Sequence, residues 1–170
     1  MPFTPFHFGP AAALKAVVPR HFSFSVFCFA QVVTDAEVLV HIAHGGEALH
    51  QHLHTYLGAT GAGLFSWLAG RPVCRAALRW WRKTEGLPLK EYYDPSPEIT
   101  PLAAISGAFI GTWSHVFLDS LIYANMTPLA PFSAANPAFG LIGPGALHAI
   151  CFLSGVIGAW LCVRLPGGKL

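Results

Sequence analysis

The stretch from Phe139 to Val163 contains no Asp, Glu, Lys or Arg, and it most constrains how this chain can fold. An apolar run longer than about 18 residues can cross the hydrocarbon core of a membrane as a helix. Charged residues are scarce everywhere, at 11% of 170 residues, while hydrophobic residues reach 54%. This composition is typical of a membrane protein. The alternative, a very apolar soluble helical domain, leaves the small number of surface charges unexplained.

Three further segments are candidate spans. Residues 22–42 are apolar in their first half, residues 53–70 carry no charged side chain, and residues 102–123 contain His115 and Asp119 as their only basic and acidic residues. We therefore predict an all-α integral membrane helical bundle that forms a single domain, residues 1–170. It has a short N-terminal helix and about four transmembrane helices, at 22–42, 53–70, 102–123 and 141–163.

The basic residues all fall on one side of this four-span arrangement. Each of the ten precedes the first span, lies between the second and third, or follows the fourth: Lys15, Arg20, Arg71, Arg75, Arg79, Arg82, Lys83, Lys90, Arg164 and Lys169. Because basic residues accumulate in short cytoplasmic loops, both termini are predicted to be cytoplasmic. In the basic loop 71–100, arginines recur every four residues beside Trp80 and Trp81, which predicts an amphipathic helix at the lipid interface.

The net charge of the chain also limits which binding partners are expected. A formal net charge of +2 is too small for a nucleic-acid-binding surface, so nucleic acid is not an expected partner. Membrane lipid is an expected partner. The residues do not specify the oligomeric state, so a homo-oligomer stays open, and the substrate, a small molecule or a lipid, is equally unspecified.

Residues 102–123 carry their polar groups at a helical spacing. Gly107, Gly111, His115, Asp119 and Tyr123 recur every four residues and so share one helix face. The glycines permit close approach of another helix. Ionisable groups inside a membrane destabilise a protein by several kcal/mol unless they are paired or bind a metal, so this face must contact protein. His115 and Asp119 can bind one cation, or Asp119 can orient His115 without any metal.

Other ionisable residues could join this pair. Asp35 and Glu37 point roughly 200° apart on a helix, so only one is expected to reach the same site, and we select Asp35. Glu37 is predicted to pair with His41 or to lie at the outer interface. Among the alternating histidines before the second span, His54 is the preferred ligand candidate, and His50 is the second choice.

The candidate residues lie at a similar predicted depth. At 1.5 Å per residue, Asp119 is ~6 Å and Asp35 ~10 Å from the outer ends of their helices. His54 also lies toward the outer end of its span, and His148, one turn inside the fourth span, is either a ligand or a polar cap. Their convergence predicts a divalent-metal site near the outer face, and histidine-rich sites favour zinc.

Several short motifs follow one another through most of the chain. They are the opening MPFTPFHFG, the pair Thr34-Asp35, the block from His50 to Tyr56, and SHVFLD at 114–119 followed by Met126-Thr-Pro. In their order and spacing the chain resembles the family of LexA-binding, inner-membrane-associated metal-dependent hydrolases and related uncharacterised bacterial membrane proteins. The resemblance implies a location in the bacterial inner membrane, hydrolysis with a divalent metal, and the ligands His7, Asp35, His54, His115 and Asp119.

The position of His7 conflicts with the predicted topology. Residues 10–18 would form a helix of only ~14 Å, which is too short to cross a membrane. The charge rule therefore places His7 on the side opposite to His115. Either the N-terminal segment folds back into the bundle, or the charge rule fails here, or His7 is structural.

Taken together, these patterns predict a hydrolase. A divalent metal, Zn²⁺, bound by His54, His115, Asp119 and Asp35 would activate water for attack on an ester or phosphoester, with Asp35 and Asp119 as the catalytic carboxylates. The interfacial depth suggests a lipid-like substrate. Two other classes stay open. One is a non-catalytic protein that relays ions or binds haem through His115 and His148. The other is a structural subunit whose polar groups hold its helices together.

Overall fold

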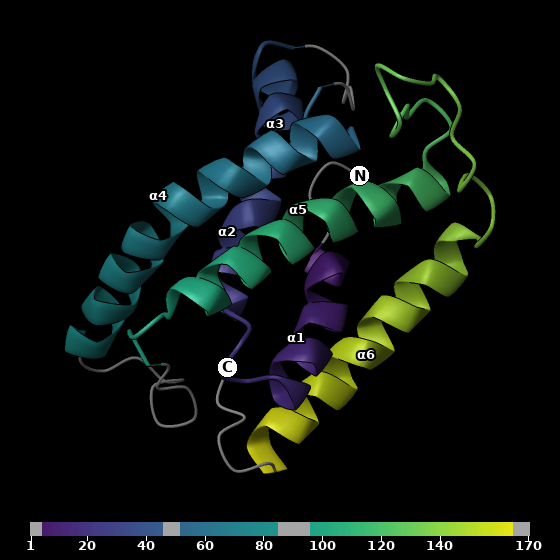
Figure 1. The fold of residues 1–170 in the computed structure, drawn as a ribbon. Coiled ribbons are helices and arrows are strands. Elements are labelled where there is room, and N and C mark those ends of the chain that lie inside the picture. Colours follow the sequence, from purple (N-terminus) through teal and green to yellow (C-terminus); the bar gives the residue numbers. More distant parts are fainter. Residues whose placement is uncertain (1–4, 46–51, 85–95, 165–170) are drawn as a thin grey trace.

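The structure, a computed structural model, describes residues 5–45, 52–84 and 96–164. Over these ranges it is built from helices alone, which confirms the predicted all-α class (Figure 1). A short 3-10 helix, η1 (Pro5–His7), is followed by six α-helices: α1 (Phe8–Val17), α2 (Phe24–Thr34), α3 (Ala36–Ala43), α4 (Tyr56–Lys83), α5 (Pro101–Ile122) and α6 (Pro144–Arg164). Helix α1 packs on α6, while α2, α4 and α5 pack against one another.

Two of the described helices, α5 and α6, are long and apolar enough to cross a membrane, and they match the predicted third and fourth spans. Helices α2 and α3 make a third candidate if the bent pair is one span. The described helices thus provide two or three candidate spans. Helix α4, which contains the predicted second span, is not among them, because its uncharged part ends at Gly70.

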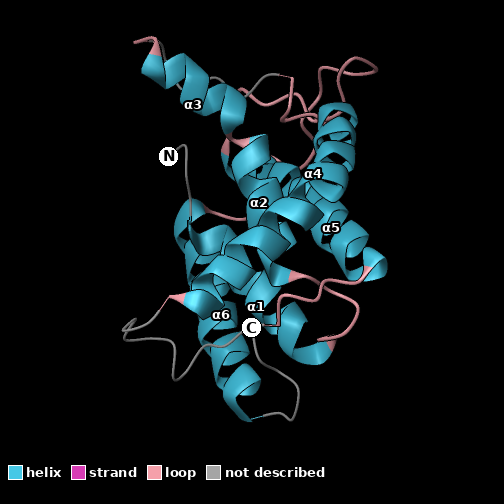
Figure 2. Cartoon of the chain, turned by 90° about the vertical axis from the view of Figure 1, so that its left-hand side faces the viewer, coloured by secondary structure: helices cyan, strands magenta, loops and turns pink. Residues whose placement is uncertain are grey.

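The predicted span at 22–42 is broken near its middle. Helix α2 ends at Thr34, α3 begins at Ala36, and the two are bent by 42° (Figure 2). The Thr34 hydroxyl donates to the carbonyl of Ala30 at 3.0 Å, and such bonds from Ser or Thr to the preceding turn often bend helices. Asp35 lies at the break. Side chains on either side of it therefore do not keep the angular spacing of one straight helix.

The basic segment after residue 70 also differs from the prediction. Instead of forming a separate interfacial helix, residues 71–83 continue α4 without interruption, although Pro72 lies inside it. Helix α4 starts where the Thr55 hydroxyl accepts a hydrogen bond from the Gly58 amide at 2.9 Å. At its basic end Arg71 Nε donates to the carbonyl of Ile99 at 2.9 Å, which ties α4 to the start of α5. The rest of the predicted interfacial loop, residues 85–95, lies outside the described residues.

Glycines bring α5 directly against α2, as their spacing predicts. A Cβ added to Gly107 would lie 2.5 Å from the Ser23 carbonyl oxygen, and one added to Gly111 would lie 2.9 Å from the Cβ of Ala30. Neither position has room for a side chain. The polar residues that follow on the same face of α5, beginning with His115, are therefore held against protein rather than lipid.

The N-terminal segment folds back into the bundle. Helix α1 packs along α6 so closely that a Cβ on Gly9 would overlap the Cys151 carbonyl, and one on Gly158 would overlap the Ala13 amide. The C-terminal ends of α1, α4 and α6 all point toward the lower half of Figure 1, whereas α3 lies at the top. His7, at the start of α1, thus lies away from the ends that carry most basic residues.

Candidate metal centre

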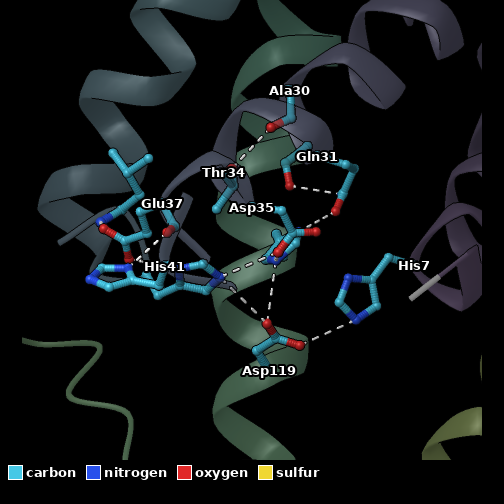
Figure 3. Close-up of polar contacts among 12 residues, drawn as sticks. His7, Ala30, Gln31, Thr34, Asp35, Glu37, His41 and Asp119 are labelled. Atoms are coloured by element: carbon cyan, nitrogen blue, oxygen red, sulfur yellow. Dashed lines mark hydrogen bonds and ion pairs between the residues drawn. The ribbon is translucent and has the colours of Figure 1, made fainter. Parts of the chain in front are cut away.

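Five ionisable side chains, each at least 95% buried, meet where four parts of the chain converge. His7 ends η1, Asp35 separates α2 from α3, His54 precedes α4, and His115 and Asp119 lie one turn apart on α5. Figure 3 labels His7, Asp35 and Asp119 of this group. These are the residues that the sequence motifs select. They form two overlapping groups that could hold a metal ion: Asp35 with His54 and His115, and His7 with His115 and Asp119.

The imidazole and carboxylate atoms are separated by distances expected between ligands of one metal. His115 Nε2 lies 3.2 Å from Asp35 Oδ1 and 3.3 Å from Asp119 Oδ2. His54 Nε2 lies 3.6 Å from the same atom of Asp35 and 3.8 Å from the same atom of Asp119. Two ligands about 2.0–2.1 Å from a tetrahedral zinc are about 3.3 Å apart. A cation between these four residues needs only small adjustments of the side chains.

Gln31 determines which nitrogen of His115 carries a proton. The Gln31 amide nitrogen donates to the carbonyl of Gly111 at 3.0 Å, so its oxygen is the atom that faces His115 Nδ1, at 2.5 Å. Because that oxygen only accepts, Nδ1 must donate. In a neutral ring Nε2 then presents a lone pair toward two carboxylate oxygens, and it is buried without a hydrogen bond. Such an arrangement is unfavourable unless a positive charge lies between them.

Glu37 contacts the opposite side of His54, which corrects the prediction that it stays outside the site. Its Oε1 lies 3.1 Å from His54 Nδ1, and its Oε2 accepts from the Leu53 amide at 3.0 Å. His41 Nδ1 contacts the backbone carbonyl of Glu37 rather than its side chain, at 2.8 Å. The break at Asp35 allows Asp35 and Glu37 to reach the two nitrogens of one ring. Metal-binding histidines commonly have such a carboxylate partner.

His7 joins the cluster through Asp119. Its Nε2 lies 3.4 Å from Asp119 Oδ1, and its ring meets the His115 ring edge-on with 4.8 Å between centroids. Of the three alternatives left by the sequence, the structure therefore favours the folded-back N-terminal segment. His7 Nδ1 is buried and makes no hydrogen bond. Burial lowers the pKa of His7 to about 4, although the Asp119 carboxylate acts in the opposite direction, so the ring is neutral at pH 7.

The electrostatics of His54 differ from those of His7. Burial acts to lower the pKa of His54, but its contacts with Asp35 and Glu37 outweigh burial and raise that pKa above 6.5. Three carboxylates thus surround this ring within 4 Å. Excess negative charge of this kind favours a bound cation.

The two remaining histidine candidates are His148 and His50. The His148 ring packs against Phe6, with 4.8 Å between centroids, so the structure gives no support for a pair with His115. His50 lies outside the described residues. Sequence reasoning missed Gln31, although it precedes Asp35 by one helical turn and could have been placed on the same face.

The chain was also compared with known proteins. No protein-family model, curated protein or solved structure matches it. The buried cluster itself offers imidazole nitrogens and carboxylate oxygens in groups that could hold a metal ion. This donor set suits a divalent metal such as zinc, which accepts both ligand types.

Proposed function

We propose that this protein is a membrane-embedded, metal-dependent hydrolase that binds a divalent metal, Zn²⁺, at Asp35, His54, His115 and Asp119. The observation that carries the proposal is the orientation of His115. Its Nδ1 is directed to Gln31, and its buried Nε2 faces two carboxylate oxygens at 3.2 and 3.3 Å without a hydrogen bond. A metal ion at Nε2 satisfies both carboxylates, and so does a proton that makes the ring an imidazolium; the zinc measurement below distinguishes the two.

The donor set favours zinc over magnesium. Magnesium prefers oxygen ligands and retains water, whereas two imidazoles with carboxylates suit zinc. Asp35, His54 and His115 supply three ligands, and Asp119 approaches the same two imidazoles from α5. Gln31 and Glu37 hold the ligand histidines in the tautomer that exposes Nε2.

When bound, such a metal lowers the pKa of a coordinated water toward ~7 and polarises an ester or phosphoester. The proton transfer and the positioning of the reacting groups would be carried out by side chains of the protein. Asp35 and Asp119 are the catalytic carboxylates in this proposal, because each has an oxygen facing the ligand histidines and a second oxygen that can accept a proton. His7 positions Asp119 by contacting its Oδ1. The buried site excludes bulk water, which strengthens these interactions.

In a membrane, α4 would add a fourth span to α5, α6 and the bent pair of α2 and α3. Helix α4 is 28 residues long, but its uncharged part, residues 56–70, covers only about 22 Å at 1.5 Å per residue, so we propose that the remaining span continues into the first basic turn of α4, whose arginines extend toward the surface. The one-sided basic residues support a cytoplasmic location for the basic ends of α1, α4 and α6, whereas His7, at the other end of α1, lies with the cluster and not on the predicted cytoplasmic side. The cluster then lies near the outer face of a bacterial inner membrane. The same residues carry the resemblance to the inner-membrane-associated metal-dependent hydrolases, so we propose membership of that family.

Elemental analysis of detergent-purified protein tests the proposal. We expect stoichiometric zinc in the wild type and in His148→Ala, a histidine outside the cluster. Since changes near a metal ligand weaken binding 10- to 100-fold, loss of two ligands in His115→Ala/Asp119→Ala should weaken it by more than about 100-fold. Hydrolysis of p-nitrophenyl esters and of bis-p-nitrophenyl phosphate should fall in parallel.

A different result would favour a structural role. If the wild type neither contains a divalent metal nor binds added zinc in equilibrium dialysis, the hydrolase proposal is wrong. The cluster would then be a set of polar contacts that holds η1, α2 and α5 together. In that case His115→Ala should lower the thermal stability and change nothing else.

A further inference from the structure

An apolar groove runs between α1 and α6 beside the metal centre. Its volume is about 430 Å³, within the range of small-molecule binding pockets. None of the described residues that line it is charged, and most are aromatic or small: they include Phe6, Phe8, Ala12, Phe152, Val156 and Ala159. The groove therefore suits a hydrocarbon chain rather than a polar solute.

One end of the groove lies on the chain segment that carries His7 of the His/Asp cluster. Phe6 and Phe8, which line the groove, are the immediate neighbours of His7, and His7 Nε2 lies 3.4 Å from Asp119. If the Nε2–H faces this carboxylate, Nδ1 is left as an acceptor, and it is buried without a hydrogen bond. The groove therefore ends beside the chain segment that holds His7, although His7 itself does not line it.

The groove is also oriented as a membrane lipid would be. Helices α1 and α6 run in the same direction, because Gly9 adjoins Cys151 and Ala13 adjoins Gly158. The groove follows α6 from Cys151 to Ala159, about 12 Å at 1.5 Å per residue, nearly half of the hydrocarbon thickness. It therefore leads from the cluster near the outer face toward the bilayer centre, as the acyl chain of an outer-leaflet lipid does.

The side of the groove formed by α6 is continuous with the apolar surface of a candidate span. Phe152 and Val156 are 59% and 52% exposed. We propose that the groove binds one acyl chain of a membrane lipid, whose ester or phosphoester group lies at the His/Asp cluster. This inference rests on the proposed hydrolase and names its substrate class. The open, apolar side favours a chain that enters laterally from the bilayer over a soluble ligand.

A photoactivatable lipid tests this inference directly. The probe is a lysophosphatidylcholine with a diazirine in the middle of its acyl chain, added to protein in phosphatidylcholine vesicles. Cross-linked peptides are mapped by mass spectrometry. In the wild type we expect labelling of α1 and of α6 between Cys151 and Ala159. Val156→Phe and Ala159→Phe would each place a bulky ring in the groove. Because a change of one methylene in an apolar pocket alters binding selectivity by about 10- to 200-fold, each variant should reduce this labelling at least about tenfold.

The matched control is Ala149→Phe, the same kind of substitution on α6 at an exposed residue that does not line the groove. It should leave the labelling unchanged. Zinc is measured in the same samples, and because Val156 and Ala159 are both exposed, their variants should keep it. Zinc retention thus also reports that each variant has folded.

The two readouts separate the two proposals. If zinc is present but labelling is uniform around the helices, or if all three variants label alike, the groove inference is wrong and the hydrolase proposal stands. If labelling is specific but the protein binds no zinc, the acyl-chain site stands and the hydrolase proposal fails.

Discussion

Helices α5 and α6 are of similar length and are both apolar enough to cross a membrane, but their surroundings differ. Within its most apolar stretch 44% of α5 is buried, against 22% of α6. Helix α5 lies between α2 and α4, whereas α6 contacts mainly α1 and η1. The more enclosed helix carries His115 and Asp119, while α6 has no acidic residue and its only Lys or Arg is the terminal Arg164.

Small residues have different consequences in the two helices. On α5, Gly107 and Gly111 bring α2 so close that Gln31 reaches both the Gly111 carbonyl and His115. On α6, Gly155 and its neighbours bring α1 close but are followed by apolar residues, and a groove remains beside the contact. The comparison teaches that close helix contact builds a polar site only where the adjoining turns supply polar side chains. On α6 the same contact leaves an apolar groove.

The largest effect is expected from filling the contact between α2 and α5. In Gly111→Leu the added Cβ would lie 2.9 Å from the Cβ of Ala30, and the rest of the side chain has no space. Overpacking of this kind typically destabilises a protein by about 1–3 kcal/mol, and the shift should also displace Gln31. Thermal unfolding in detergent measures the loss of stability.

The control for this prediction is Gly61→Leu in α4. No atom lies within 4 Å of a Cβ added to Gly61, and leucine favours helix by up to about 1 kcal/mol over glycine, so its stability should stay equal or rise. Equal melting temperatures for the two variants would contradict the view that α5 depends on its protein contacts.

A smaller effect is expected when the helices stay in contact but the polar link between them is removed. Gln31→Met has a similar size but leaves His115 Nδ1 without its acceptor. Loss of such a partner typically weakens metal binding about 10- to 100-fold. Zinc affinity, measured by competition with a chelating dye, checks this. Val32→Met, on the next residue and 44% exposed, should bind zinc as the wild type does. Unchanged affinity in Gln31→Met would show that His115 is oriented by other contacts.

Much of the fold could be predicted because the strongest signals are local. The apolar runs at 102–123 and 141–163 correspond to α5 and α6 within a few residues at each end. The continuation of α4 through its basic half could not be predicted in the same way. A stripe of arginines indicates an amphipathic helix, but it does not say whether that helix is joined to the preceding one. Pro72 suggests a boundary, yet the helix continues through it.

The candidate site was predictable where ionisable residues stand out against apolar neighbours, as His115 and Asp119 do. Glu37 was excluded because its angle from Asp35 assumes a straight helix, and the bend of 42° removes that assumption. The place of His7 depends on how α1 packs against α6, a long-range contact that the basic residues do not report. Gln31 was not predicted because it is neutral, and the site residues were selected from the sequence by their ionisable side chains. Its role becomes visible only through the His115 ring that it contacts.

The smallest effect is expected at the other end of α5, where polar contacts are exposed. Glu98, three residues before α5, lies 3.2 Å from Arg75 Nη2 and 3.8 Å from Arg79 Nη2, and its side chain is 70% exposed. Exposed ion pairs contribute about 0–1 kcal/mol and are screened by salt, so Glu98→Gln should change stability by less than about 1 kcal/mol. Thermal unfolding of the variant and the wild type at low and high salt checks this, and the small difference should shrink further at high salt. A salt-independent loss as large as that of Gly111→Leu would mean that the α4–α5 contact at this end, rather than the glycine contact with α2, holds α5 in place.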